Sequence, residues 1–113
     1  AVVTGSNSGI GLGIAIELAR AGADVVLNSF TDRTEDHALA AKLSLEHGVA
    51  VRYVAADMSK GDDCRRLVAD AGRCDILVNN AGVQHVAPIE EFPAEQWNRI
   101  LAINLSSAFH TTA

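Results

Sequence analysis

The sequence predicts an α/β fold in which helices cover both faces of a parallel sheet. Short runs of Val, Ile and Leu alternate with longer helical segments, and this alternation implies parallel strands joined by right-handed crossovers. The strand segments are almost continuously apolar, as expected when both faces of a sheet are buried. The 113 residues are 49% hydrophobic and 20% charged, which is the composition of a globular protein and the length of one small domain.

Four strands are expected where apolar runs are bounded by turn-forming residues. They are residues 1–4 (AVVT), 24–30 (DVVLNSF), 49–56 (VAVRYVAA) and 74–80 (CDILVNN). The core between the strands and helices is expected to be aliphatic, because only 4% of the residues are aromatic.

The first two helices are expected at about residues 10–20 and 34–46. Gly22 and Gly48 follow them and are suited to end a helix. Thr34 is expected to cap the second helix, whose first turn is acidic and therefore complements the helix dipole. The apolar face of this helix is expected to carry three residues, Ala38, Leu39 and Leu43.

The third helix is expected at about residues 60–71, where Ser59 and Asp62 have the spacing of a capping box. The fourth begins at Pro93, because the missing N–H of proline costs nothing in a first turn. The sequence stops inside this helix with no capping or breaking residue. We therefore expect residues 1–113 to form a single domain that is truncated after the fourth strand and part of the following helix.

Charge and cysteine usage exclude several functional classes. The net charge is −5 with no basic cluster, so no nucleic-acid partner is expected. No apolar run is long enough for a membrane span, so no membrane partner is expected either. The two cysteines, Cys64 and Cys74, are isolated, and the histidines are scattered, so no disulfide framework and no metal site is expected. Reduced thiols of this kind are typical of a cytoplasmic protein.

A glycine-rich turn separates the first strand from the first helix. It contains Gly5, Gly9, Gly11 and Gly13 among the polar residues Thr4, Ser6, Asn7 and Ser8. Glycine allows backbone to approach a phosphate closely, and the following helix N-terminus offers N–H groups to a diphosphate. The spacing matches neither G-x-G-x-x-G nor a P-loop, so a tight turn that needs glycine only for packing stays open.

A bound dinucleotide would place its adenosine ribose near the end of the second strand. That end carries Asn28, Ser29 and Phe30, without the carboxylate that would accept hydrogen bonds from both ribose hydroxyls. Asp32 lies just beyond, and Arg33 is close enough to meet a 2′-phosphate. These residues leave the choice between NAD and NADP open.

A second polar turn follows the fourth strand. Asn79 and Asn80 can bind neighbouring backbone, while Ala81 and Gly82 leave space for a flat ligand. Both turns lie at the carboxyl ends of parallel strands, where ligands of open α/β sheets bind. Asn104 is a polar residue on an apolar helix face, and it is either paired in the core or functional.

Together these motifs resemble the short-chain dehydrogenase/reductase family, which has a Rossmann-type doubly wound sheet. The resemblance rests on "TGSNSGIG" at residues 4–11, on Asp57, on "NNAG" at residues 79–82 and on Asn104. Further stretches, "NNAGVQHVAPIEEFP" and "INLSSAFHTT", are similar to the members that interconvert 3-hydroxybutyrate and acetoacetate with NAD.

The resemblance implies a role for each matching residue. The cofactor-binding set is Gly5, Ser6, Asn7, Ser8, Gly9, Ile10, Gly11, Phe30, Asp57, Met58, Asn79, Ala81 and Gly82. Asn104 would be a catalytic residue that perturbs its helix and holds a water molecule. Gln84 would bind the substrate carboxylate, although a solvated loop is the alternative for that residue.

The family also implies parts that these residues do not supply. A Ser and a Tyr-x-x-x-Lys motif, which carry the proton chemistry, are expected beyond Ala113, and this part alone is expected to be inactive. The full-length protein is expected to be a homotetramer acting on a hydroxy acid or ketone. Two alternatives remain: a sugar or 3-oxoacyl reductase that uses NADP, and a non-catalytic nucleotide-binding module.

Overall fold

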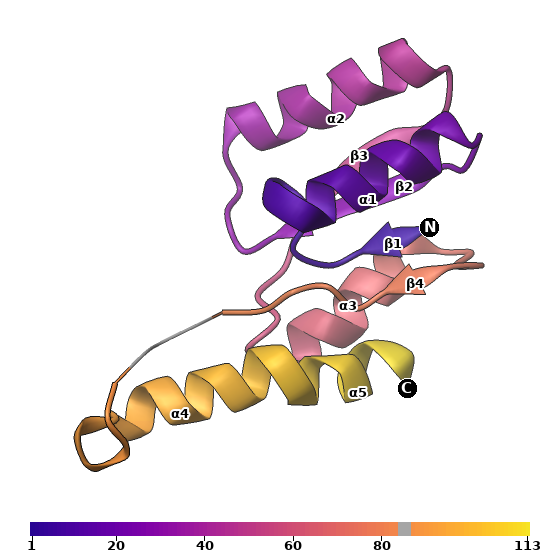
Figure 1. The fold of residues 1–113 in the computed structure, drawn as a ribbon. Coiled ribbons are helices and arrows are strands. Elements are labelled where there is room, and N and C mark those ends of the chain that lie inside the picture. The colour runs from indigo at the N-terminus through magenta and orange to yellow at the C-terminus, as the bar shows by residue number, and fades with distance from the viewer. Residues whose placement is uncertain (84–86) are drawn as a thin grey trace.

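A computed structural model describes residues 1–83 and 87–113, and it confirms the predicted α/β fold with a parallel sheet (Figure 1). The strand order is β3-β2-β1-β4, and every described pairing is parallel. The strands are β1 (Val2–Val3), β2 (Val25–Ser29), β3 (Val51–Ala55) and β4 (Leu77–Val78). They are shorter than the apolar runs that predict them.

Helices lie on both faces of the sheet (Figure 1). One face is covered by α1 (Gly9–Arg20) and α2 (Thr34–His47). The other is covered by α3 (Gly61–Ala71) and a C-terminal helix, whose parts are α4 (Ala94–Leu101), η2 (Ala102–Ser106) and α5 (Ser107–Thr112). A 3₁₀ turn, η1 (Ile89–Glu91), precedes α4.

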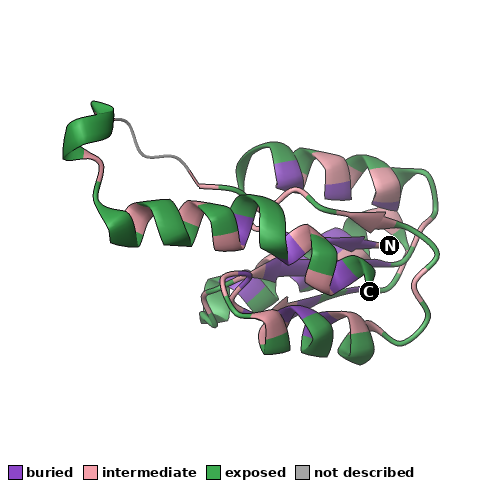
Figure 2. Ribbon diagram, turned by 90° about the horizontal axis from the view of Figure 1, so that it is seen from below, coloured by how far each residue is buried: buried purple, intermediate pink, exposed green. Residues whose placement is uncertain are grey.

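The core is divided into two layers by the alternation of side chains along the strands. Val3 and Leu27 belong to the cluster beneath α1 and α2, together with Tyr53. Their neighbours Val2 and Val26 belong to the cluster beneath α3 and the C-terminal helix. Figure 2 shows the buried residues in the strands and on the helix sides that face them, whereas α4 is largely exposed.

Two helix starts differ from the prediction. Thr34 is the first residue of α2 rather than its cap; the cap is Arg33, whose backbone N–H donates to the Asp36 carboxylate at 3.0 Å. Likewise Lys60 caps α3, and the Ser59 hydroxyl donates to Asp57 instead. In both cases a nearby carboxylate accepts a hydrogen bond at the start of the helix. A spacing rule for hydroxyl caps does not take such carboxylates into account.

The buried side of α2 also differs from its predicted apolar face. Asp36, Ala40 and Leu43 are buried, whereas Ala38 is exposed. These three residues are spaced at i, i+4 and i+7, the spacing of one helix face. The prediction is confirmed for Leu43 and for the half-buried Leu39, which packs against the same cluster, and it is wrong for Ala38; Asp36 was missed because it is a carboxylate.

The C-terminal helix is interrupted by the π-helical segment η2, which contains Asn104. The Ser107 N–H donates to the Ala102 carbonyl, five residues back, instead of the Ile103 carbonyl four residues back. The Ser107 hydroxyl donates to the Ile103 carbonyl at 2.5 Å and so replaces the missing backbone bond. The resemblance implied a perturbed helix at Asn104, and the structure contains one.

Candidate cofactor-binding site

The candidate site lies where the loops after β1 and β4 leave the sheet. β1 pairs with β2 on one side and with β4 on the other. The chain continues from β1 to α1 on one face and from β4 toward the C-terminal helix on the opposite face (Figure 1). Such a point opens a crevice at the carboxyl ends of the strands, where open α/β sheets bind ligands.

Thr4 and Asn80 join the two loops. The buried Thr4 hydroxyl accepts hydrogen bonds from the N–H groups of Asn80 and Ala81, both at 3.0 Å. In return, the Asn80 side-chain amide donates to the carbonyls of Thr4 at 3.2 Å and Gly5 at 3.1 Å. Hydrogen bonds within the chain therefore set the relative position of the two loops.

Two glycines of the turn are required by the packing of the protein against itself. A Cβ atom on Gly5 would lie 2.9 Å from Ala81 Cα, and one on Gly11 would lie 2.3 Å from the Gly5 carbonyl oxygen. Gly9 has the same φ of +61° as Gly5, but no atom lies within 4 Å of the position that its Cβ would take. Gly5 and Gly11 thus bring α1 and the β4 loop together, while the space beside Gly9 is open to a ligand.

The N-terminus of α1 is suited to bind an anion. Its cap residue, Ser8, makes no side-chain hydrogen bond to the helix, and the first turn contains no acidic residue. By contrast, the first turns of α2 and α3 each contain two acids. Because a helix N-terminus carries partial positive charge, α1 is the one of these three helices whose start is free for a diphosphate.

A pocket of about 240 Å³ opens beside these loops. Seven of the residues predicted to bind a cofactor line it: Gly5, Asn7, Phe30, Asp57, Met58, Ala81 and Gly82. Six lining residues lie outside the predicted cofactor-binding set: Asn28 and Ser29, which the sequence placed at the ribose end, and Ala56, Val83, Arg99 and Ile103. The pocket has apolar walls and a few polar groups, which fits a purine and its ribose.

The other predicted cofactor residues lie elsewhere. Ser8, Gly9 and Ile10 are exposed at the start of α1, and Gly11 is buried beneath the turn. Ser6 is buried, where its hydroxyl donates to the Val3 carbonyl at 2.7 Å. The Asn79 side chain accepts from the Thr111 hydroxyl at 2.6 Å, so it contacts α5 rather than the pocket. Gln84 lies outside the described residues.

Asn28 closes the inner end of the pocket. Its side-chain oxygen accepts from the Gly5 N–H at 3.2 Å, and its amide nitrogen donates to the carbonyls of Val54 and Ala56 at 3.1 and 3.2 Å. It is completely buried. The polar residue at the end of β2 therefore ties three strand ends together instead of presenting its side chain to solvent.

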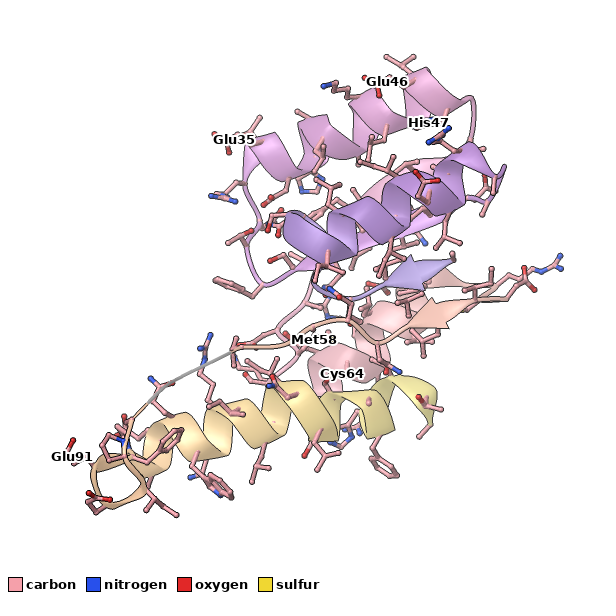
Figure 3. All side chains as sticks on the ribbon, viewed as in Figure 1. Glu35, Glu46, His47, Met58, Cys64 and Glu91 are labelled. Atoms are coloured by element: carbon pink, nitrogen blue, oxygen red, sulfur yellow. The ribbon has the colours of Figure 1, made fainter. Side chains whose placement is uncertain are left out.

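Asp57 and Met58 form the wall of the pocket at the end of β3. Burial raises the pKa of Asp57, but hydrogen bonds from the Ser59 hydroxyl and N–H and the charges of Lys60 and Arg99 outweigh it, so the pKa is lowered. Met58 is buried, and its Sδ lies 3.7 Å from the Cys64 Sγ. Figure 3 labels both residues beside α3. The wall thus pairs an ionised acceptor with an apolar surface.

Asn104 holds the segment that follows the β4 loop. Its side-chain oxygen accepts from the Val83 N–H at 2.8 Å, and its amide nitrogen donates to the Val83 carbonyl at 2.9 Å. Both polar atoms of Asn104 therefore contact a residue that lines the pocket. The sequence left Asn104 either hydrogen-bonded in the core or functional. In the structure its side chain is hydrogen-bonded, but to the loop beside the pocket rather than to the core.

Asp36 binds the pocket-lining residue Asn7, and the sequence analysis did not identify it. It is 3% exposed and accepts hydrogen bonds from the Asn7 amide at 3.2 Å, the Thr31 hydroxyl at 2.8 Å and the Arg33 N–H at 3.0 Å. Burial raises its pKa, but these hydrogen bonds and that of the Arg33 side chain outweigh burial and lower the pKa to about 2. Its position in an acidic first turn was the only signal in the sequence.

The low pKa of Asp36 predicts an acid-dependent loss of stability. The group contributes fully above its ordinary pKa of 3.8, and the contribution is lost as the pH falls toward about 2. At neutral pH we expect Asp36→Asn to lower the free energy of unfolding by about 2 kcal/mol. Urea unfolding of both proteins between about pH 7 and 3 should show this difference shrinking with acidity; a difference that is independent of pH would contradict the assignment.

Two further observations concern the part of the chain that the structure describes. None of its helices is both long enough and apolar enough to cross a bilayer. In the same residues, His, Cys, Asp and Glu side chains do not gather into groups of three that could hold a metal ion.

Comparison with known proteins agrees with this fold and identifies its family. The family model described as short chain dehydrogenase matches residues 1–113. D-beta-hydroxybutyrate dehydrogenase from Cupriavidus necator is 55% identical over 99% of this chain and 44% of its own length. The enzyme of the same name from Rhizobium meliloti is 52% identical over 98% of this chain and 45% of its own length.

A solved structure shares both the fold and part of the sequence. L-Sorbose reductase from Gluconobacter frateurii, complexed with NADPH and L-sorbose, superposes with a TM-score of 0.89 and 34% identity over 98% of this chain and 43% of that one. This chain spans less than half the length of these relatives. The parallel sheet, the crevice at its carboxyl edge and the family match lead to one conclusion: the chain belongs to the short-chain dehydrogenase family.

Proposed function

We propose that this chain is the cofactor-binding part of a cytoplasmic, NAD-dependent dehydrogenase that interconverts 3-hydroxybutyrate and acetoacetate. The observation that carries the proposal is the pocket at the carboxyl edge of the sheet, lined from both predicted turns, in a chain 55% identical to a D-beta-hydroxybutyrate dehydrogenase. Because that relative is more than twice as long as the aligned region, the activity is proposed for the whole protein that carries this chain.

Different residues of the chain would bind different parts of a dinucleotide. The exposed N-terminus of α1 and the open space beside Gly9 would hold the diphosphate. Asp57 would accept from the adenine amino group, with Met58 and Ile103 against the ring. Ala81 and Gly82 would border the cofactor on the β4 side, and Gln84 would bind the substrate carboxylate.

The bound nicotinamide would supply the hydride chemistry, and this chain would contribute positioning. Asn104 would fix Val83 at the pocket and order a water molecule beside the π-helical segment. The Ser and the Tyr-x-x-x-Lys motif that move the proton are proposed to lie beyond residue 113. In this proposal the described residues would supply the binding site, and the acid–base pair would come from the rest of the protein.

The proposed activity is tested with purified protein expressed from the complete reading frame. We expect reduction of NAD by D-3-hydroxybutyrate, followed by absorbance of NADH, and little turnover of sugars such as gluconate or sorbitol. Turnover of sugars with NADP, in place of 3-hydroxybutyrate, would support the second candidate, a sugar reductase. The NADPH in the sorbose reductase structure is the observation that favours this candidate.

The third candidate is a nucleotide-binding module without catalysis. Binding and turnover measurements on the same purified protein distinguish it from both enzymes. It predicts binding of adenine nucleotides with no turnover of any alcohol or ketone. A Ser and a Tyr-x-x-x-Lys motif in the reading frame after residue 113 would contradict it.

We also propose that the full-length protein is a homotetramer in which the C-terminal helix forms part of an interface. Trp97, Leu105 and Phe109 on this helix are 58%, 66% and 69% exposed, which is unusual for such large apolar side chains. We expect Leu105→Asp to shift the protein to smaller species in light scattering after size exclusion. Leu45→Asp, on the outer face of α2 at 88% exposure, is the control and should leave the mass unchanged.

A further inference from the structure

The end of β2 lacks a carboxylate in contact with the pocket. Asn28 is committed to strand-end hydrogen bonds, and Ser29 and Phe30 complete this part of the lining. Asp32, the next acid along the chain, is exposed and lies 2.6 Å from the exposed His37 ring. The ribose end of the pocket therefore needs another source of hydrogen-bond acceptors.

Asp36 is a buried carboxylate close to this end. The preceding residue, Glu35, points away from the protein at the start of α2 (Figure 3), whereas Asp36 is almost completely buried. An ionised carboxylate can only accept hydrogen bonds. The Asn7 atom 3.2 Å from Asp36 Oδ1 must therefore be the amide nitrogen, and the orientation of the Asn7 side chain follows from this chemistry.

This orientation determines which atom Asn7 presents to a ligand. Asn7 lines the pocket, and its Nδ2 is taken by Asp36. Its Oδ1 accepts no hydrogen bond from the residues that the structure describes. Asp36 accepts one of the two Nδ2 hydrogens, and because the amide oxygen and nitrogen point in different directions from the same carbon, this contact also fixes the direction of the acceptor Oδ1.

We propose that Asp36 is a positioning residue that turns the Asn7 carbonyl oxygen toward the pocket, where it accepts a hydrogen bond from a ribose hydroxyl of the cofactor. This inference rests on the proposed binding of a dinucleotide. Asp36 does not touch the ribose itself; it acts through Asn7 and so takes the place of the carboxylate that the end of β2 lacks.

The arrangement selects against a 2′-phosphate. A phosphate group offers only acceptor oxygens, so it would face the Asn7 oxygen with no donor. Arg33 could bind a phosphate, but its guanidinium lies 3.5 Å from the Asp36 carboxylate and is attracted to it. The geometry therefore favours a cofactor with a free 2′-hydroxyl, such as NAD.

The test compares NADH and NADPH binding by calorimetry in the complete protein. Asp36→Asn keeps the shape of the side chain but can donate as well as accept, so the Asn7 amide is free to turn its nitrogen toward the pocket. We expect the preference for NADH over NADPH to fall about tenfold, which is a change of about 1.4 kcal/mol in the difference between the two binding free energies. Asp32→Asn removes the same charge from an exposed site and should leave the preference unchanged.

A double-mutant cycle with Asn7→Ala separates positioning from a purely structural role. If Asp36 acts through Asn7, Asp36→Asn should change the preference in the wild-type background and have almost no effect in the Asn7→Ala background. A change of the same size in both backgrounds, or a loss of melting temperature with an unaltered preference, would overturn this inference alone. Failure of the wild-type protein to bind either dinucleotide would overturn the proposed function as well.

Discussion

Gly11→Ala is expected to destabilise the protein by about 3 kcal/mol or more and to lower cofactor affinity at least about tenfold. The new Cβ would lie 2.3 Å from the Gly5 carbonyl oxygen and 2.5 Å from the Asn80 amide nitrogen. Both neighbours are held by the hydrogen bonds that join the β1 and β4 loops, so α1 must move away from the sheet. Chemical unfolding and calorimetry with NADH measure the two effects.

Gly13→Ala is the matched control for this substitution. Gly13 is exposed in α1, and no atom lies within 4 Å of the position of its Cβ. Alanine in a helix is more favourable than glycine by about 0.5–1 kcal/mol, so Gly13→Ala should raise stability and leave binding intact. Equal effects of the two substitutions would contradict the packing described for Gly11.

Thr4→Val is expected to cost about 2–3 kcal/mol of stability and to weaken cofactor binding, although valine has the shape of threonine. The substitution removes the hydroxyl that accepts from the Ala81 and Asn80 N–H groups. After the substitution the Asn80 N–H still donates to the Val78 carbonyl at 3.1 Å. The Ala81 N–H has no second acceptor among the residues that the structure describes. The loop that carries Ala81 and Gly82 should therefore loosen at the pocket.

Thr4→Ser distinguishes the contribution of the Thr4 hydroxyl from that of its methyl group. Serine keeps the acceptor and loses one buried methyl, which costs about 1 kcal/mol. We expect Thr4→Ser to retain cofactor affinity and Thr4→Val to lose it, as measured by urea unfolding and by titration with NADH. If valine and serine at position 4 bind the cofactor equally well, the Thr4 hydroxyl does not position the β4 loop.

The fold class could be predicted because it depends on chain-wide periodicity. Alternating apolar runs and helical segments require parallel strands between two helical layers, and the glycine turn had to fall at a strand end. Individual caps could not be predicted in the same way. Thr34 and Ser59 have the right residue types and spacing, but Asp36 and Asp57, two or three residues from the groups that bind them, accept the hydrogen bonds. A spacing rule does not decide between such competing local groups.

The same distinction applies to the site. The order of residues was enough to place two polar turns at the carboxyl edge of one sheet, because the strand order along the chain and parallel pairing leave no other place for them. The three-dimensional contacts were needed to show that Asn80 rather than Asn79 joins the turns, and that Asp36 in α2 binds Asn7 in the loop before α1. These contacts connect residues 75 and 29 positions apart in the sequence, and local patterns carry no information about such distances.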